Sequence, residues 1–414
     1  MNADTMGRGY DRAGTDGRQA WTVALAAAVA AAVGLGTAAS HGVLVAALIP
    51  LTIGGVGAGA VLVATSTVLQ FGLSPVVGGL TFRWGVARVV LVGAVCYGAG
   101  TGVAATSGAG TLGVLAYAVG TGVAGACTLA PLLATTAGWF VRWRAAAIGL
   151  VSAGNGLGAL VLAPWLATSV STRGLQATWG LLAVVGSGAL LAAVLLLRTP
   201  PVVGQRPAPW RWREVLADRP LRALYVAAVV GATGMIASLT YLVVYARSVG
   251  FRPEHAAGLL GLVGAVGVAS RLAVVAVPAQ RAFAAYRASQ AAMAGSAVGW
   301  LLAPARPPML VAFAVVFGVA SGLWATLAPL VVAAAHPEQL TSTLGVLYTA
   351  PAIGGALGPL VAAALVEVAS LVSVGGVLAG CFLVALALLR PLVPSNASPP
   401  PIPAPALATE QEHA

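Results

Sequence analysis

Residues 21–42 read WTVALAAAVAAAVGLGTAASHG, a run without a charged side chain. A membrane-spanning helix needs about 20 predominantly apolar residues. A strand of a membrane barrel would instead alternate apolar and polar side chains over about 10 residues, but residues 21–33 are apolar on every side. The run therefore predicts a transmembrane helix.

Eleven similar runs follow along the chain. With the first, they predict spans over residues 21–42, 57–80, 88–107, 111–138, 145–168, 177–197, 221–246, 256–277, 288–304, 308–333, 342–366 and 371–390. The composition agrees, because 59% hydrophobic residues, 7% charged residues and a mean hydropathy of +0.95 lie far outside the range of soluble domains. We predict an all-α polytopic membrane protein with twelve transmembrane helices. The first 20 residues are polar, so they are no signal peptide.

The basic residues predict the orientation of these spans. All 21 are arginines, and cytoplasmic loops of membrane proteins carry an excess of basic residues. Arg271 lies within a span, and only Arg173, Arg247, Arg252 and Arg306 fall on the side away from the N-terminus. We therefore expect a multi-pass protein of the cell membrane with both termini cytoplasmic. The net charge of +11 then reflects topology and not nucleic-acid binding.

A polar, basic segment divides the spans into two groups of six. The expected parts are a cytoplasmic N-terminal tail (1–20), a first six-helix half (21–198), a cytoplasmic linker (199–220), a second half (221–392) and a Pro-rich, disordered cytoplasmic tail (393–414). The halves also share a repeat, AGNGLGALV at 153–161 and IGGALGPLV at 353–361. Small residues at this spacing let helices approach closely.

Arg271 is the charged residue that needs an explanation, since a guanidinium in hydrocarbon costs roughly 3 kcal/mol on insertion scales. One interpretation is that it snorkels past Val277 to the cytoplasmic interface and anchors its helix, a reach of about 9 Å. The other is that it contacts a substrate or a gate. Side chains lean toward the N-terminus of their helix, so in a span that enters from outside Arg271 points back toward the midplane.

The acidic residues offer Arg271 no partner at that depth. They lie in the tails, linker and loops or at the outer end of the eleventh span: Asp4, Asp11, Asp16, Glu214, Asp218, Glu254, Glu338, Glu367, Glu410 and Glu412. A guanidinium favours a carboxylate or a similar planar anion. Surroundings of Ala, Val, Gly and Leu would exclude strongly hydrated polyanions, so the expected partner is a small organic monocarboxylate.

The loop after the second predicted span carries a family pattern. It reads Gly78-Gly-Leu80-Thr-Phe82-Arg83-Trp-Gly85-Val-Ala-Arg88. With the twelve spans and the central linker, it resembles the signature loop of the major facilitator superfamily, Gly-x-Leu-x-Asp-Arg-x-Gly followed by basic residues. The resemblance covers essentially residues 16–392 and implies the superfamily's fold. Phe82 replaces the family's Asp, which puts the usual gate chemistry in doubt. Ordinary positive-inside charge is the alternative for Arg83 and Arg88.

A second segment narrows the resemblance. It reads Trp139-Phe140-Val-Arg142-Trp-Arg144-Ala-Ala-Ala147-Ile-Gly149-Leu-Val-Ser-Ala153-Gly154-Asn155-Gly-Leu-Gly158. It is similar to the monocarboxylate transporter family's signature, aromatic-Phe-x-basic-x-Arg-x-x-Ala-x-Gly-x-x-x-Ala-Gly-x-x-x-Gly. Residues 16–21, Asp-Gly-Arg-Gln-Ala-Trp, resemble that family's Asp-Gly-x-x-Gly-Trp. Arg271 falls where that family has its substrate-binding arginine, although the acid that several members carry one turn earlier is Gly267 here.

Proton coupling has one candidate within a span. His41 is either an outer-interface residue that closes the first helix or a proton acceptor that titrates near neutrality and adds a second cation beside the anion. In the resembled family a lysine lies in this part of the first span, but counting from Trp21 places it two residues before His41.

Other polar and aromatic side chains of the spans could line the substrate path or join helices to one another. They are Gln70, Asn155, Tyr241, Tyr245, Gln290, Trp324 and Tyr348. Among them we assign Asn155, Tyr241 and Tyr348 to the substrate site. Trp165, Trp179 and Trp300 lie near span ends and are expected to be interfacial anchors.

No soluble catalytic domain, cofactor motif or metal-spaced cluster is recognisable, and Cys96, Cys127 and Cys381 lie singly in different spans. We therefore expect no enzyme. The leading interpretation is an alternating-access carrier of a small organic anion, working as a monomer in the bilayer and driven by the proton gradient. The alternatives are a drug or antibiotic exporter of the same fold, and a non-transporting membrane sensor or assembly factor.

Overall fold

The computed structural model describes residues 15–52, 54–200, 212–274, 277–335, 343 and 346–390. Every regular element in these ranges is helical. The first half comprises α1 (Arg18–Ala39), α2 (His41–Leu48), α3 (Gly55–Gly72), α4 (Ser74–Trp84), α5 (Val86–Ser107), α6 (Thr111–Thr128), α7 (Ala130–Trp139), α8 (Arg144–Arg173), α9 (Leu175–Leu181), the π-helix η2 (Leu182–Gly186) and α10 (Ser187–Leu196). Residues 1–14 of the predicted N-terminal tail, residues 201–211 of the linker and the whole C-terminal tail, which was predicted to be disordered, lie outside the described residues.

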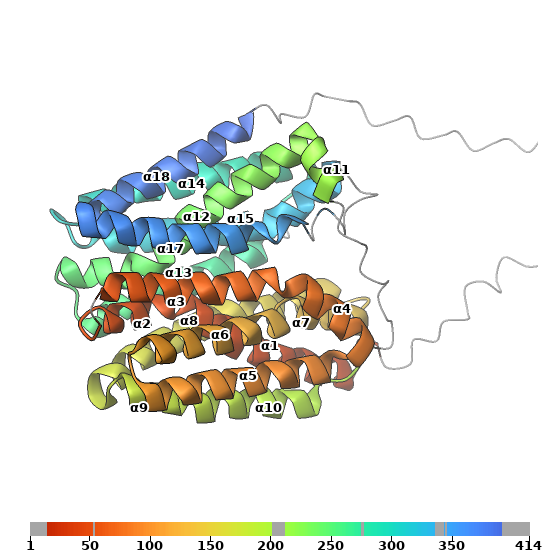
Figure 1. The fold of residues 1–414 in the computed structure, drawn as a ribbon. Helices are drawn as coiled ribbons and strands as arrows, with labels where there is room; N and C mark the ends of the chain where they lie inside the picture. Colours follow the sequence, from red (N-terminus) through yellow and green to blue (C-terminus); the bar gives the residue numbers. More distant parts are fainter. Residues whose placement is uncertain are drawn as a thin grey trace, which may run out of the picture.

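The short helix α11 (Trp212–Ala217) precedes the second half. That half comprises α12 (Arg219–Ser248), α13 (Pro253–Ala273), the 3-10 turn η4 (Ala279–Arg281), α14 (Ala282–Leu302), α15 (Met309–Ala335), α17 (Ala350–Val368) and α18 (Leu371–Leu388). The two halves lie against each other as two bundles (Figure 1). Helices α4, α7 and α11 lie at one end of the molecule, here named the linker end, and α2 and α9 lie at the opposite end (Figure 1).

The helices confirm an all-α multi-pass membrane protein. Among the described residues, eleven helical segments are long and apolar enough to cross a membrane, and they coincide with eleven of the twelve predicted spans. The remaining prediction, 288–304, falls on α14, which has 21 residues but is not one of those eleven segments. It contains Arg287 and Gln290, which lower its hydropathy. It packs between α15 and α18 inside the second half.

Some predicted boundaries were wrong. The first span does not end at residue 42, because α2 carries it on to Leu48. Helix α13 ends at Ala273 and not at Val277. Hydropathy alone could not place these ends, because the residues beside each of them are apolar on both sides of the boundary.

Several spans are built from two helical pieces. Ser40 separates α1 from α2, and its hydroxyl donates to the carbonyl of Gly36 at 2.8 Å. Pro75 and Pro131 stand at the starts of α4 and α7, where a missing backbone N–H costs least. Gly85, with a φ of +80°, makes the tight turn between α4 and α5, a conformation that favours glycine.

The predicted repeat is confirmed by equivalent packing in the two halves. Gly154 and Gly158 of α8 lie against backbone atoms of α1, and Gly354 and Gly358 of α17 lie against backbone atoms of α12. In each half, a glycine pair at the same repeat positions therefore lets the fifth spanning helix pack closely on the first.

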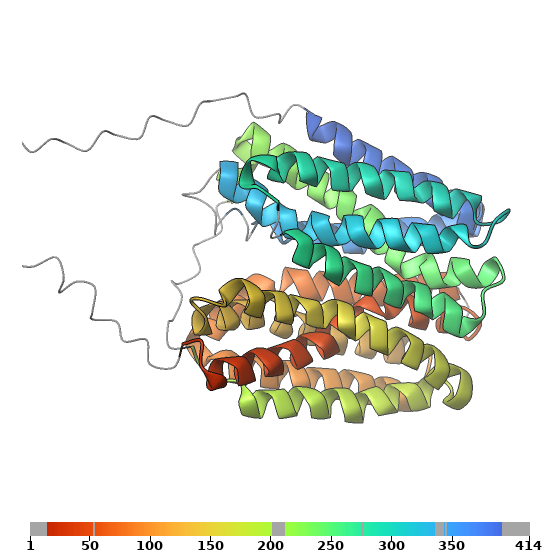
Figure 2. The ribbon, with the colours of Figure 1, turned by 180° about the vertical axis from the view of Figure 1, so that it is seen from behind.

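The contacts between the halves follow the same symmetry. The fifth span, α8, packs on α13, and its counterpart in the second half, α17, packs on α3. Figure 1 shows α17 beside α3, and Figure 2 shows the α8–α13 pair from behind. Helices α2 and α12, which belong to the first span of each half, also pack together.

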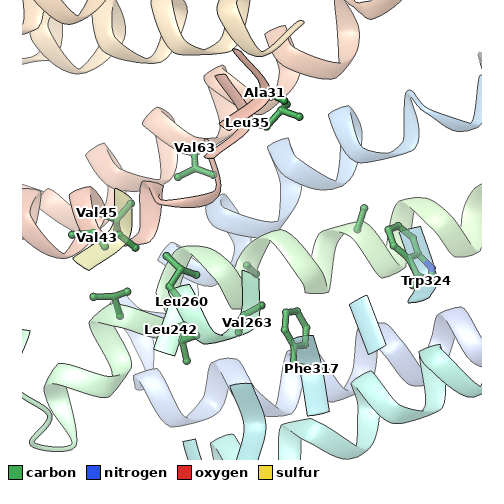
Figure 3. Packing of buried hydrophobic residues seen from close by; sticks show 14 of the residues in the cluster. Ala31, Leu35, Val43, Val45, Val63, Leu242, Leu260, Val263, Phe317 and Trp324 are labelled. Atoms are coloured by element: carbon green, nitrogen blue, oxygen red, sulfur yellow. The ribbon is translucent and has the colours of Figure 1, made fainter. Parts of the chain in front are cut away.

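The α2–α12 contact joins the halves at the opposite end. A Cβ atom on Gly42 would lie only 2.5 Å from the carbonyl oxygen of Leu239, so a larger residue at 42 would push α2 off α12. Arg247 Nη1 donates to the carbonyl of Ala46 at 3.4 Å. Val43 and Val45 of α2 lie near Leu242 of α12 in the same buried core (Figure 3). The structure is thus packed shut at this end of the interface.

Candidate functional site

Arg271 lies at the boundary between the two halves. It occupies the last turn of α13, and its Nη1 donates to the carbonyl of Ser152 on α8 at 3.4 Å. Its Nε is buried and has no hydrogen-bond partner among the described residues. The guanidinium thus spans the α8–α13 seam with unused donor capacity, in a position where an anion could contact both halves.

The contact with Ser152 bears on the direction of the side chain. Ser152 stands eight residues beyond Arg144, where α8 begins at the linker end, which is about 12 Å along the helix. Arg271 is two residues from the end of its own helix. Its guanidinium therefore reaches away from the linker end and toward the middle of the bundle, as the lean of helical side chains predicts. This geometry favours substrate or gate contact over snorkelling.

The described acidic side chains lie at helix ends and away from Arg271. Asp16 and Asp218 accept hydrogen bonds from the starts of α8 and α12, while Glu254 and Glu367 lie at the opposite end, at the start of α13 and the end of α17. No hydrogen bond or ion pair between Arg271 and these four carboxylates is present.

His41 lies in a different environment from the one predicted. Because the first span continues to Leu48, His41 does not close a helix at the outer interface, and that interpretation was wrong. The side chain is 3% exposed. Its Nδ1 is 3.3 Å from Ser66 Oγ of α3, and its ring packs against Tyr117 of α6 in a T-shaped arrangement. His41 thus faces the core of the first half, and the structure gives it no contact in common with Arg271.

The remaining predicted substrate residues differ in what they contact. Tyr241 is fully buried, and its hydroxyl donates to the carbonyl of Pro359 at 3.2 Å. Tyr241 therefore joins α12 to α17, which is the second of the two roles predicted for such side chains. Tyr348 is 46% exposed in the turn before α17. Asn155 lies on α8, and its side chain is outside the described part of the structure.

The signature loop forms the α4–α5 turn at the linker end. Gly78, Leu80 and Arg83 lie on α4, and Arg88 lies in the first turns of α5. Arg83 and Arg88 are exposed. Phe82 is 47% exposed, so at this position the chain presents a ring to its surroundings where the resembled loop has a carboxylate.

The two segments that resemble monocarboxylate transporters come together in space. The Asp16 carboxylate accepts hydrogen bonds from the backbone N–H groups of Val141, Arg142 and Trp143, at 3.1 to 3.3 Å, immediately before α8. The Asp16 N–H donates to the carbonyl of Trp139. Asp16, from the first motif, therefore caps α8, which starts within the second motif. We name this set of contacts the α8 cap.

Aromatic and basic groups surround the α8 cap. The rings of Trp21 and Phe140 lie edge to face at 4.9 Å, and Trp139 Nε1 donates to the carbonyl of Arg198 at 3.2 Å. Arg144 Nε donates to the carbonyl of Phe140, and the Arg142 guanidinium lies over the Trp143 ring. Both arginines therefore contact the cap locally and lie apart from Arg271.

Electrostatics at the α8 cap favours the charged carboxylate. Desolvation of Asp16 raises the pKa, but the N–H groups of Arg142, Trp143 and Val141 and the charge of Arg142 outweigh it, so the pKa of Asp16 is lowered from its ordinary value of 3.8. Asp16 has a φ of +59°, a conformation that Asp tolerates better than most residues.

Residues 59–286, more than half of the chain, match the family described as the Major Facilitator Superfamily. The chain belongs to the major facilitator superfamily.

Curated relatives of this superfamily member are monocarboxylate transporters. It is 32% identical over 149 residues to Monocarboxylate transporter 11 of Homo sapiens, covering 35% of this chain and 32% of the relative. It is 32% identical over 198 residues to Monocarboxylate transporter 13 of Bos taurus, covering 47% of this chain and 46% of the relative. The matched region thus spans less than half the length of these relatives.

The superfamily fold is also evident from a solved structure. The crystal structure of a D-xylose-proton symporter superposes with a TM-score of 0.67 over 90% of this chain and 98% of the other, at 11% identity. This likeness concerns the fold alone. The relatives and the fold are those of transporters, so the expectation that the chain is not an enzyme is confirmed.

Sequence reasoning missed several residues of the superfamily fold's interior. Trp179 and Trp300 are fully buried and are not interfacial anchors. Trp179 stacks on Tyr117, and Trp300 Nε1 donates to the carbonyl of Leu371. Their burial depends on which face of the helix meets the bundle, which position near a span end does not reveal. Ser152 contacts Arg271 through its backbone, which leaves no signal in the sequence.

Proposed function

We propose that this chain is a secondary active transporter that carries a small organic monocarboxylate across the cell membrane by alternating access, together with a proton and with both termini cytoplasmic. The observation that carries the proposal is Arg271, a guanidinium at the seam between the halves whose Nε lacks a partner.

The chemistry of the site selects the substrate class. A carboxylate can accept two parallel hydrogen bonds from a guanidinium, and it would also satisfy the Nε that is buried without a partner. Since no described acidic side chain neutralises Arg271, a single negative charge on the substrate would balance it. The names of the curated relatives, monocarboxylate transporters, support the same class.

The arrangement of the halves supports alternating access. Three helix pairs, α2–α12, α3–α17 and α8–α13, connect the bundles, and they are related by the internal repeat. A rocking motion about such an interface can expose a central site to one side at a time. Arg271 lies on one of these pairs, so the same contacts would change as the substrate binds.

Counterflow of radiolabelled lactate in proteoliposomes tests the proposal. The wild-type protein should exchange the label with unlabelled lactate inside the vesicles. Arg271→Ala should abolish exchange at low substrate concentration, because loss of a charge-assisted contact of this kind costs roughly 2–5 kcal/mol. Arg271→Lys should restore it only in part, since an ammonium lacks the planar fork.

Arg287 provides the matched control. It is a second helical arginine whose buried Nε has no partner among the described residues, but it lies on α14, which packs within the second half. Arg287→Ala should leave counterflow intact. Absence of wild-type exchange with every short carboxylate tested would contradict the proposal, as would exchange that Arg271→Ala does not alter. Efflux of hydrophobic drugs by the same vesicles would point instead to an exporter.

A further inference from the structure

The core of the first half contains a row of three aromatic rings with unused polar atoms. The ring of His41 on α2 meets Tyr117 on α6 at 5.8 Å, and Tyr117 stacks on Trp179 of α9 at 5.6 Å. His41 is 3% exposed and the other two are fully buried. His41 Nε2, the Tyr117 hydroxyl and Trp179 Nε1 have no hydrogen-bond partner among the described residues.

Unpartnered polar atoms at this depth need a ligand. A buried donor or acceptor without a partner costs about 1–3 kcal/mol, and nearly all such groups in folded proteins are satisfied by protein or by ordered water. The three residues are in ring contact with one another in turn, and a buried water molecule requires several polar partners of the kind they carry.

The hydrogen bonds of Ser66 define which nitrogen of His41 is free. Ser66 Oγ donates its hydrogen to the carbonyl of Val63 at 3.2 Å. In the arrangement in which that hydrogen lies on Val63, Ser66 accepts from His41, and Nδ1 of the neutral ring carries the hydrogen. The lone pair is then on Nε2, the atom without a partner. The neutral imidazole thus directs a proton acceptor into the site.

Two helix irregularities lie beside the same residues. The helix of the first span is interrupted at Ser40, directly before His41, and the π-helix η2 begins three residues after Trp179. Such π-helical turns interrupt regular helices and are frequent at functional sites. Both irregularities occur in the spans that contribute rings to the row.

We propose that His41, Tyr117 and Trp179 form a buried water-binding site in which His41 Nε2 accepts the proton that moves with the transported anion; this rests on the proposed function. In the proton step, a hydronium ion in the site passes its proton to Nε2. One O–H bond breaks, one N–H bond forms, and neutral water remains. The proton site and the anion site are then separate, one inside the first half and the other at Arg271.

Few other ionisable groups surround His41. Tyr117 is the one on α6 that faces it, and from α12 Arg247 reaches the backbone of α2 at Ala46. Helix α3 presents Ser66 and α9 presents Trp179, and neither helix contains an acidic, basic, cysteine or tyrosine residue. Arg18 of α1 and Arg144 and Arg173 of α8 stand at helix ends. Among these groups, His41 is the one with an imidazole, whose ring nitrogen can accept a proton.

The position of His41 on α2 connects the proton to the interface. The neighbouring Gly42 packs on the backbone of α12, and Ala46, one turn further on, accepts the bond from Arg247. Helix α2 has only eight residues and is separated from α1 by the break at Ser40. A charge gained at His41 would thus act on the short segment that holds the opposite end shut.

Two transport measurements in the same proteoliposomes test the site. Counterflow of lactate at equal pH needs only anion exchange, whereas accumulation driven by an inward proton gradient needs coupling. His41→Gln should keep counterflow and lose accumulation above equilibrium. Tyr117→Phe and Trp179→Phe, which each remove one polar atom and keep the ring, should lower gradient-driven accumulation and spare counterflow.

Tyr97→Phe is the matched control. Tyr97 is also fully buried in this half, but its hydroxyl is already bonded to Thr37 Oγ1 at 3.1 Å, so accumulation should stay at the wild-type level. Accumulation that persists in His41→Gln would overturn the proton site while leaving the anion proposal in place. A wild-type protein without counterflow would instead contradict the proposed function.

A structural measurement tests the water site independently of transport and of the fate of the variants. A cryo-electron microscopy map that shows ordered water elsewhere in the protein should contain density within hydrogen-bonding distance of His41 Nε2. A dry site in such a map would overturn the proposal.

Discussion

At the scale of single residues, Arg271 and His41 lie on helix faces with different contacts: Arg271 contacts the other half of the molecule, and His41 contacts the core of its own half. Arg271 faces α8 across the seam and donates to a backbone carbonyl of the other half. His41 faces the core of its own half, and the adjacent Gly42 faces α12. On α2, two consecutive residues therefore differ in their contacts: His41 packs inside the first half, and Gly42 packs on the second.

Asp16 allows a prediction about pH. Because its pKa is lowered in the folded protein, the α8 cap stabilises the fold above the ordinary value of 3.8, and this contribution is lost as the pH falls through the lowered pKa. Asp16→Asn should therefore lower the melting temperature at neutral pH, and the difference from wild type should shrink below about pH 4.

Thermal unfolding of the purified protein in detergent measures this effect. Asp11→Asn, in the N-terminal tail, is the control for a lost charge and should leave the melting temperature unchanged. A difference between Asp16→Asn and wild type that stays constant down to pH 3 would mean that the charge of Asp16 does not contribute to the α8 cap.

At the scale of elements, the twelve runs and the repeat could be predicted because burial in lipid leaves a direct mark on hydropathy. The break at Ser40 and the end of α13 could not, because apolar residues continue through both. The α8 cap was also beyond local reasoning. Asp16 caps a helix that begins 128 positions later in the chain, so the contact depends on tertiary packing.

The α8–α13 seam can be tested with a glycine on α8. A Cβ on Gly156 would lie 2.6 Å from the carbonyl oxygen of Gly264, so Gly156→Leu should separate the helices and cost about 1–3 kcal/mol through overpacking. Because the Ser152–Arg271 contact lies on the same seam, lactate counterflow should also fall.

Gly102→Leu provides the comparison, since Gly102 lies within α5 with no other residue close to its Cβ position. It should leave stability and counterflow near the wild-type level. If Gly156→Leu behaved like Gly102→Leu in both assays, the close approach of α8 to α13 would not matter for the site.

At the scale of the whole molecule, the α2–α12 pair joins the two halves at the end opposite the linker. A covalent link between these helices tests directly whether the halves must separate at that end during transport. The Cβ position of Gly42 lies 3.6 Å from the carbonyl carbon of Leu239, which brings the two Cα atoms within about 7 Å, near the range that a disulfide spans. A bond between these positions would join the halves across the α2–α12 contact.

The prediction concerns Gly42→Cys with Leu239→Cys in a protein with Cys96, Cys127 and Cys381 replaced by Ala. When reduced, this variant should exchange lactate more slowly than wild type, because a side chain at 42 displaces α2; on oxidation it should lose counterflow altogether, and reductant should return it to the reduced rate. The control pair, Val45→Cys with Gly59→Cys, joins α2 to α3 within one half, where a Cβ on Gly59 would lie 3.2 Å from that of Val45. It should retain counterflow when oxidised, because a link inside one bundle does not oppose rocking of the two bundles. Exchange that continued with the first pair fully cross-linked would show that α2 and α12 need not separate during transport, which would contradict alternating access at this interface.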